Sequence, residues 1–184
     1  GASTGGFTDC LLQAGAAEVV ALDVGHGQLH ERLRRDDRVV VVERTNLRSL
    51  EPGDFGTFDA AVADLSFISL RLVMANLVAA VAPGGWMVLL VKPQFEAGRR
   101  EVAKGSGVVS DPEVWRRTVS EVASTAEELS AAIMGVMVSP IRGAEGNVEF
   151  LLHLARASAP PVGDRESLVD RAVADAIAER EENR

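Results

Sequence analysis

Short apolar runs alternate with segments of helical spacing along the first half of the chain. Predicted helices over residues 8–14, 28–35 and 70–81 separate predicted strands over residues 19–23, 39–43, 58–64 and 86–91. Uninterrupted apolar strands that are joined through helices are typical of a parallel sheet covered on both faces. Each of these strands ends in or directly before a charged residue, and we expect those residues to gather at one edge of the sheet.

The second half of the chain changes its pattern. A loop rich in glycine and charge is predicted over residues 93–110, followed by a helix over 111–129 with Asp111 as N-cap and Pro112 in its first turn. Two further strands, 132–138 and 148–154, flank a turn-forming segment, and a linker over 158–163 precedes an amphipathic tail helix. We therefore expect one α/β domain over residues 1–157, with 158–184 as linker and C-terminal helix of the same domain.

The glycine-rich start of the chain suggests a strand that the sequence does not contain. In a doubly wound sheet such a loop normally follows the first, central strand, and here nothing precedes Gly1. The sequence thus predicts a mostly parallel, seven-stranded sheet whose first strand lies upstream of residue 1.

Composition and charge restrict the class of protein. The 184 residues are 47% hydrophobic with a formal charge of -8, which supports a folded core and limits any nucleic-acid contact to a local surface. One cysteine excludes an internal disulfide, and three scattered histidines suggest no metal site. Without an apolar run of about 18 to 20 residues, we expect a cytoplasmic protein with no membrane contact.

The glycine loop and the ends of the next two predicted strands form the first candidate site. Glycines let the backbone approach a ligand closely, and Asp23 could accept hydrogen bonds from ribose hydroxyls. The residues Glu43 to Asn46 would lie along the same edge. The spacing is neither that of a dinucleotide loop nor that of a Walker loop, so a ligand with an amino-acid head and a nucleoside body, such as S-adenosylmethionine, fits best. A plain strand-to-helix turn is the alternative.

Asp64, Lys92 and Glu149 form the second candidate site. Charged groups at the ends of buried strands are costly unless they are paired or used in chemistry. Lysine is scarce, since only Lys92 and Lys104 occur among 19 basic residues, and lysine can lose its proton where arginine cannot. The alternatives are a structural ion pair for Asp64 and Lys92, and a water-facing position on an edge strand for Glu149; Glu145 is the weaker candidate because it lies in a loop.

Several long motifs, in this order, resemble those of the TlyA family. They are GASTGGFTD, DVGHGQL, ERTN, ADLSFISL, VKPQFE and GNVEF, and they cover roughly residues 1–154. Proteins of that family are called hemolysin-like and are similar to FtsJ-type ribose 2′-O-methyltransferases.

The resemblance implies a Rossmann-like, S-adenosylmethionine-dependent methyltransferase domain that acts on ribose 2′-hydroxyls of ribosomal RNA or ribosomal subunits. It implies a Lys-Asp-Lys-Glu tetrad in which Asp64, Lys92 and Glu149 are the last three members. The first lysine and a small N-terminal RNA-binding domain would lie upstream of Gly1. The predicted cofactor-binding residues are Gly1, Ser3, Gly5, Gly6, Phe7, Asp23, Val24, Glu43, Asn46, Asp64 and Leu65. A membrane-lytic protein and a cofactor-binding module without activity of its own are the alternative functions.

Overall fold

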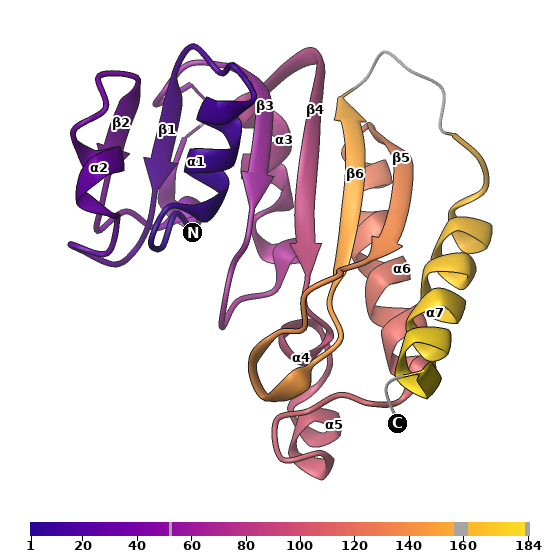
Figure 1. The fold of residues 1–184 in the computed structure, drawn as a ribbon. Helices are drawn as coiled ribbons and strands as arrows, with labels where there is room; N and C mark the ends of the chain where they lie inside the picture. Colours follow the sequence, from indigo (N-terminus) through magenta and orange to yellow (C-terminus); the bar gives the residue numbers. More distant parts are fainter. Residues whose placement is uncertain (52, 157–161, 183–184) are drawn as a thin grey trace. The chain divides into compact units, whose positions relative to one another are not determined.

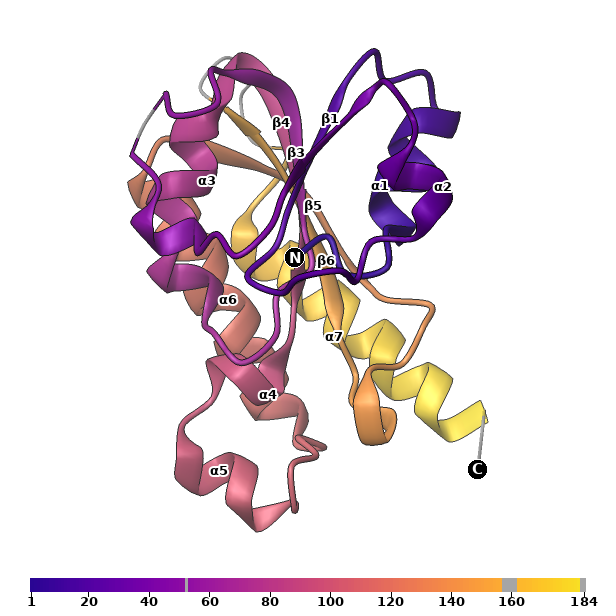
Figure 2. The same cartoon turned by 90° about the vertical axis from the view of Figure 1, so that its left-hand side faces the viewer.

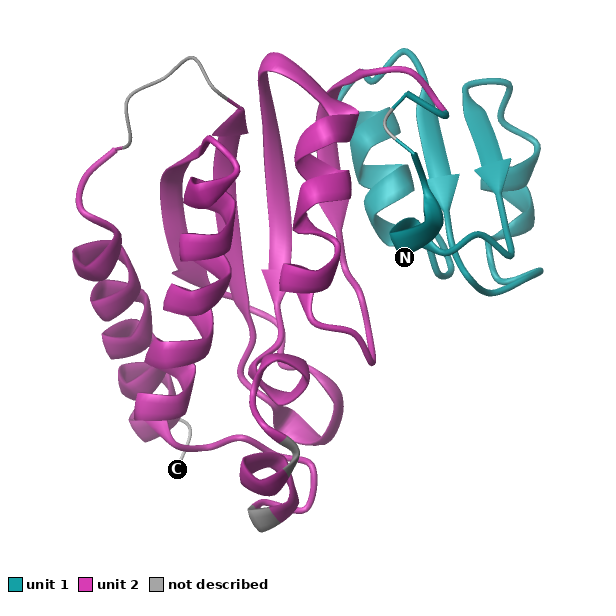
Figure 3. Ribbon diagram, turned by 180° about the vertical axis from the view of Figure 1, so that it is seen from behind, with its two compact units in different colours: residues 1–54 teal, residues 55–184 magenta. Residues whose placement is uncertain are grey.

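The computed structural model describes residues 1–51, 53–156 and 162–182. The chain forms two compact units, unit 1 over Gly1–Asp54 and unit 2 over Phe55–Arg184 (Figure 3).

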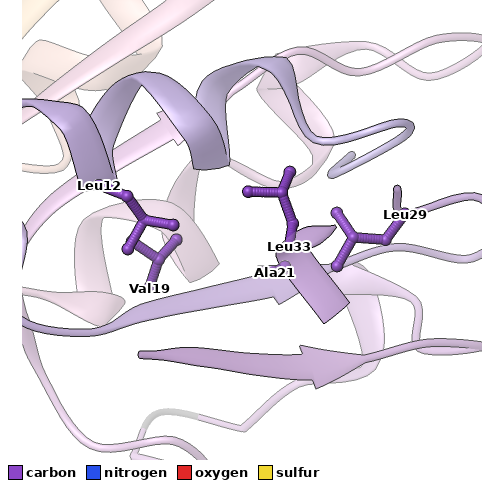
Figure 4. Close-up of a cluster of buried hydrophobic side chains, with 5 residues drawn as sticks. All are labelled: Leu12, Val19, Ala21, Leu29 and Leu33. Carbon is purple, nitrogen blue, oxygen red and sulfur yellow. The ribbon is translucent and has the colours of Figure 1, made fainter. Parts of the chain in front are cut away.

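Unit 1 is a pair of parallel strands with helices packed against it. Strands β1 and β2 run in register from the pair Val19 and Val39 to the pair Leu22 and Val42. The core of the unit packs Leu12 and Leu33 from the two helices, and Leu29 from the loop before the second helix, against Val19 and Ala21 of β1 (Figure 4). The elements are α1 (Gly6–Gln13), β1 (Val19–Leu22), α2 (Glu31–Arg34), β2 (Val39–Val42) and the 3-10 turn η1 (Leu47–Ser49).

Gly5 sets the distance between the glycine loop and this core. Its φ of 105° lies in the left-handed region, and a Cβ there would stand 2.8 Å from Leu29 Cδ1 and would also overlap Leu33. Glycine is therefore required both by the backbone conformation and by the close approach of the loop to the leucines.

Unit 2 is a mixed four-stranded sheet in the order β3-β4-β6-β5 (Figure 1). Strand β4 is parallel to β3, whereas β6 lies between β4 and β5 and is antiparallel to both. The strands are β3 (Phe58–Ala63), β4 (Val81–Val91), β5 (Ala131–Val138) and β6 (Phe150–Arg156).

The predicted single, seven-stranded and mostly parallel sheet is wrong, although each of the six strands predicted within the chain corresponds to an observed strand. Over the described residues the chain has a two-stranded parallel sheet and a four-stranded mixed one. The antiparallel pairing of β5 and β6 follows from the connection over residues 139–149, which contains only the short turn η3 (Ala144–Gly146). A parallel neighbour needs a long crossover, so two strands that are joined this directly pair antiparallel.

The longer helices of unit 2 pack against its sheet and against one another. In Figure 2, α3 and α6 lie to one side of β3 and β4. Helix α6 buries side chains three and four positions apart, from Trp115 to Ala126, and α7 packs against both α6 and β5. These elements are η2 (Leu70–Leu72), α3 (Met74–Ala80), α6 (Pro112–Glu128) and α7 (Arg165–Glu182).

The segment predicted as a loop over residues 93–110 contains two short helices, α4 (Pro93–Glu96) and α5 (Arg99–Lys104). Pro93 occupies the first position of α4, where its missing N–H costs nothing. The predicted N-cap Asp111 is confirmed, since its side chain accepts a hydrogen bond from the Glu113 N–H at 2.9 Å. The predicted linker over 158–163 lies largely outside the described residues.

Candidate active site

In unit 1, the carboxylate of Asp23 holds the glycine loop to the tip of β1. Its Oδ2 accepts a hydrogen bond from the Ser3 N–H at 2.8 Å, and its Oδ1 accepts one from the Gly25 N–H at 2.7 Å. The Ala2 N–H donates to the Leu22 carbonyl at 3.0 Å, so the loop continues alongside the strand. The two predicted features, the loop and the acid, thus form one structure.

The environment of Asp23 favours its charged form. Burial is the largest single effect and raises the pKa of this carboxyl, but the N–H groups of Gly25, Ser3 and Ala2, together with the positive charge of the Gly1 amino group, hold the pKa below its ordinary value. A carboxylate oxygen can accept more than one hydrogen bond. Asp23 therefore keeps acceptor capacity for ligand hydroxyls while it braces the loop.

Glu43 and Asn46, which follow β2, are engaged with the protein itself. The Glu43 carboxylate is paired with Arg34, accepts the Gly27 N–H at 2.9 Å and lies 2.7 Å from His26 Nδ1. The hydrogen bond from Arg34 is the main reason that the pKa of Glu43 is lowered to about 2. Asn46 caps η1 by accepting the Arg48 N–H at 3.0 Å. Their part in cofactor binding stays a prediction.

The predicted cofactor-binding set is distributed over both units. Asp64 and Leu65 belong to unit 2, and the other nine residues belong to unit 1. Next to Asp23, Val24 is 66% exposed, so its apolar side chain is accessible to solvent. The remaining members are Gly1, Ser3, Gly5, Gly6 and Phe7, in the loop and the first turn of α1.

In unit 2, Asp64 and Lys92 form an ion pair at the ends of neighbouring strands. Asp64 follows β3 and Lys92 follows β4, and because these strands are parallel their ends meet at the same edge. Lys92 Nζ lies 2.5 Å from Asp64 Oδ1 and 3.5 Å from Ser66 Oγ. The Lys92 side chain is 13% exposed, so this cation is largely removed from water.

Glu149 completes a cluster of three ionisable side chains in unit 2. It is 5% exposed and directly precedes β6, which lies inside the sheet, so the alternative of a water-facing residue on an edge strand is wrong. Phe150 pairs with Val91, which brings Glu149 beside Lys92 in the antiparallel register. Burial raises the pKa of Glu149, against the hydrogen bond from Gln94 and the charge of Lys92, while Asp64 adds to the rise.

The sequence reasoning missed a second buried acid, Glu96 in α4. Its carboxylate accepts the Leu70 N–H at 2.7 Å and the Ser69 hydroxyl at 2.5 Å, which fixes the segment that follows Asp64. The rings of Phe67 and Phe95 are 5.1 Å apart and join the same two segments. The sequence did contain a signal for this residue, because Glu96 follows the end of a buried strand closely and stands next to the apolar Phe95.

This cluster has the properties of a site that handles a hydroxyl group. The lysine can hold an oxygen atom and exchange a proton, while two carboxylates fix the lysine by charge.

Among the residues that the structure describes, no group of three or more histidine, cysteine, aspartate or glutamate side chains could hold a metal ion. Likewise, no helix in the described ranges is both long and apolar enough to cross a membrane.

Comparison with known proteins assigns the chain to a family. Residues 1–156 match the sequence profile of the FtsJ-like methyltransferases, so the chain belongs to that family. It is 54% identical over 155 residues to the 16S/23S rRNA (cytidine-2′-O)-methyltransferase TlyA of Mycobacterium tuberculosis, covering 84% of this chain and 58% of the relative. The chain thus spans little more than half the length of the curated relatives that it matches first.

Solved structures resemble the chain in fold. A candidate hemolysin from Streptococcus thermophilus matches 100% of this chain and 66% of its own, with a TM-score of 0.92 and 43% identity. An S-adenosylmethionine-dependent methyltransferase from Mesorhizobium loti matches 85% of this chain and 88% of its own, with a TM-score of 0.60 at 18% identity. The second likeness shows the α/β methyltransferase fold alone.

Proposed function

We propose that this chain is the catalytic part of a methyltransferase that transfers a methyl group from S-adenosylmethionine to a ribose 2′-hydroxyl of ribosomal RNA. The observation that carries the proposal is the cluster of Lys92, Asp64 and Glu149 in unit 2, in a chain of the FtsJ-like family. The relative from M. tuberculosis bears the name of a cytidine-2′-O-methyltransferase of 16S and 23S rRNA, which supports the same substrate here.

The residues of unit 1 fit the cofactor. Asp23 is ionised, partly accessible and rich in acceptor lone pairs, as a ribose diol requires. The neighbouring Val24 is exposed, and its apolar side chain could contact the adenine ring. The glycine loop leaves open space at Gly6, where a Cβ would meet nothing within 4 Å. Asp23 and Val24 would thus hold the nucleoside, and the loop would hold the amino-acid end.

The residues of unit 2 would carry the chemistry. S-adenosylmethionine, when bound, would supply a methyl group on a positively charged sulfur, and S-adenosylhomocysteine would remain once the ribose oxygen–carbon bond had replaced the sulfur–carbon bond. Lys92 would orient the 2′-hydroxyl through Nζ and act as its general base. Asp64 fixes Lys92 through the 2.5 Å ion pair, and Glu149 adds a second negative charge beside it. Holding both reactants in line lowers the entropic cost of the transfer.

Methyl transfer to isolated ribosomal subunits tests this function. The chain would be assayed alone and joined to the upstream segment that the sequence resemblance predicts, with S-adenosylmethionine labelled in its methyl group. We expect label in 16S or 23S rRNA, at a nucleotide whose ribose then resists alkaline cleavage. Label on a base, or no label with either protein, would overturn the proposal. Leakage of liposomes in the absence of cofactor would instead favour the membrane-lytic alternative.

A further inference from the structure

Glu149 is held by one side-chain amide. The Gln94 Nε2 of α4 donates a hydrogen bond to Glu149 Oε1 at 3.0 Å. Gln94 comes two residues after Lys92, so the segment that positions the lysine also reaches the acid at the start of β6. The contact joins chain segments that are 55 residues apart.

Gly143 lies against the same carboxylate. A Cβ at this position would stand 2.6 Å from Glu149 Cδ and would overlap Glu149 Oε1. The φ of Gly143 is -73°, which any residue can adopt, so the backbone does not require glycine here. The space taken by the Glu149 carboxylate is what excludes a side chain.

The Gln94 amide is matched to the ionised acid. Its Oε1 is buried and has no hydrogen-bond partner among the described residues, because the amide turns its N–H toward Glu149. The amide thus donates to the carboxylate, the arrangement that favours the charged state of the acid.

We propose that Gln94 and Gly143 are positioning residues that hold the carboxylate of Glu149 beside the Asp64–Lys92 ion pair. This inference deepens the proposed function and rests on it. The charged groups that act on Glu149 are Lys92 at the end of β4 and Asp64 at the end of β3. Without the Gln94 N–H, the pKa of Glu149 would rise further, because burial would be opposed by Lys92 alone.

The first test measures the folding free energy against pH and requires no activity. The raised pKa of Glu149 means that its protonation favours the folded state, and this contribution is lost as pH rises through the raised pKa. The difference between the wild-type chain and Glu149→Gln isolates that loss. We expect the pH-dependent loss of stability to be larger in Gln94→Met than in the wild-type chain. We expect it to be absent when Gln94→Met is combined with Glu149→Gln. An unchanged pH dependence in Gln94→Met would overturn the proposal.

The second test separates positioning from simple packing by exchanging the two side chains. The double variant Gln94→Glu with Glu149→Gln keeps a carboxylate and an amide in contact but moves the charge onto α4. We expect it to regain the stability lost in Gln94→Glu, while methyl transfer stays at least tenfold below wild type. Full recovery of both stability and activity would mean that the contact is only structural.

A glycine pair supplies the matched control. Gly143→Ala should lower methyl transfer about tenfold at unchanged affinity for S-adenosylmethionine, whereas Gly135→Ala in β5, where a Cβ would meet nothing within 4 Å, should not. Equal activity of the two alanine variants would contradict the role of Gly143. A wild-type protein without activity would overturn the proposed function instead, and the pH measurement would still decide on Gln94.

Discussion

The buried carboxylate of Glu96 accepts the backbone N–H of Leu70 at 2.7 Å, although the two residues are 26 positions apart. Leu70 is the first residue of η2, which follows Asp64 in the sequence, and Glu96 is the last residue of α4, which follows Lys92. This hydrogen bond therefore ties together the two segments that carry the ion pair.

Removing this carboxylate should destabilise unit 2. In Glu96→Ala the Leu70 N–H and the Ser69 hydroxyl lose their acceptor in a buried place, which costs about 1–3 kcal/mol of unfolding free energy. Glu96→Gln keeps one acceptor and should lose less. Urea unfolding followed by tryptophan fluorescence measures both, with the exposed Glu166→Gln as control. A loss in Glu96→Ala no larger than in the control would contradict the structural role.

The strand ends could be predicted because their signal is local. When an apolar run stops at a charged residue, that residue is expected at the end of a strand, independently of the rest of the chain. Asp23, Asp64 and Lys92 each directly follow the end of such a strand. The fate of the last two strands could not be predicted this way. Their apolar pattern fits either direction, and only the short connection between them decides for antiparallel pairing.

The partners of the buried acids escaped prediction for a different reason. Gln94 meets Glu149 across 55 residues and Glu96 meets Leu70 across 26, and no periodicity along the chain encodes such contacts. The role of Gly143 depends on where the Glu149 carboxylate lies, which the fold alone determines. Sequence reasoning therefore found Asp64, Lys92 and Glu149, and missed Glu96 and the groups that hold the buried acids.

Lowering the pH should reduce the folding stability of unit 1, because Glu43 becomes protonated. Its pKa is lowered from 4.5 to about 2, chiefly by the hydrogen bond from Arg34, so the folded state binds this proton more weakly than the unfolded chain. The stabilisation is complete above the ordinary pKa and is lost as pH falls from about 4.5 to about 2. We expect Glu43→Gln to be less stable than wild type at pH 7 and to lack this part of the acid dependence.

Urea unfolding followed by the amide NMR signals of β1 reports on unit 1. Glu31→Gln, which removes an exposed acid of the same unit, is the control. If Glu43→Gln retained the wild-type acid dependence, the Arg34 pair would contribute nothing to stability.

Asp23 should govern cofactor affinity. If its carboxylate binds the ribose hydroxyls, Asp23→Ala should weaken S-adenosylmethionine binding by about 1.5–3 kcal/mol, which is roughly 10- to 150-fold. Calorimetric titration of the 184-residue chain with S-adenosylmethionine and S-adenosylhomocysteine measures this, with ATP and NAD as ligand controls. Asp37→Ala, at an exposed position of the same unit, is the protein control.

Because Asp23 also braces the glycine loop, the variant needs a test of folding before its affinity is interpreted. The Ser3 and Gly25 N–H groups lose their acceptor in Asp23→Ala, so its β1 amide signals should be compared with those of the wild-type chain. A folded Asp23→Ala with wild-type affinity would remove this residue from the cofactor site.

Lys92 should govern turnover and leave binding nearly unchanged. Its amine is paired with Asp64 and lies in unit 2, whereas most of the predicted cofactor contacts lie in unit 1. General-base catalysis contributes typically 10²- to 10⁴-fold to a rate, so Lys92→Ala should lower methyl transfer by about that factor. Single-turnover methylation of ribosomal subunits by the protein with its predicted upstream segment measures the rate, and calorimetry on the same variant measures the affinity.

Lys104→Ala removes the other lysine of the sequence and is the matched control for that experiment. A loss of rate together with a large loss of affinity in Lys92→Ala would place the lysine in cofactor binding and not in the transfer step. A rate equal to that of Lys104→Ala would show that the Asp64–Lys92 pair is a structural ion pair, the alternative that the sequence left open.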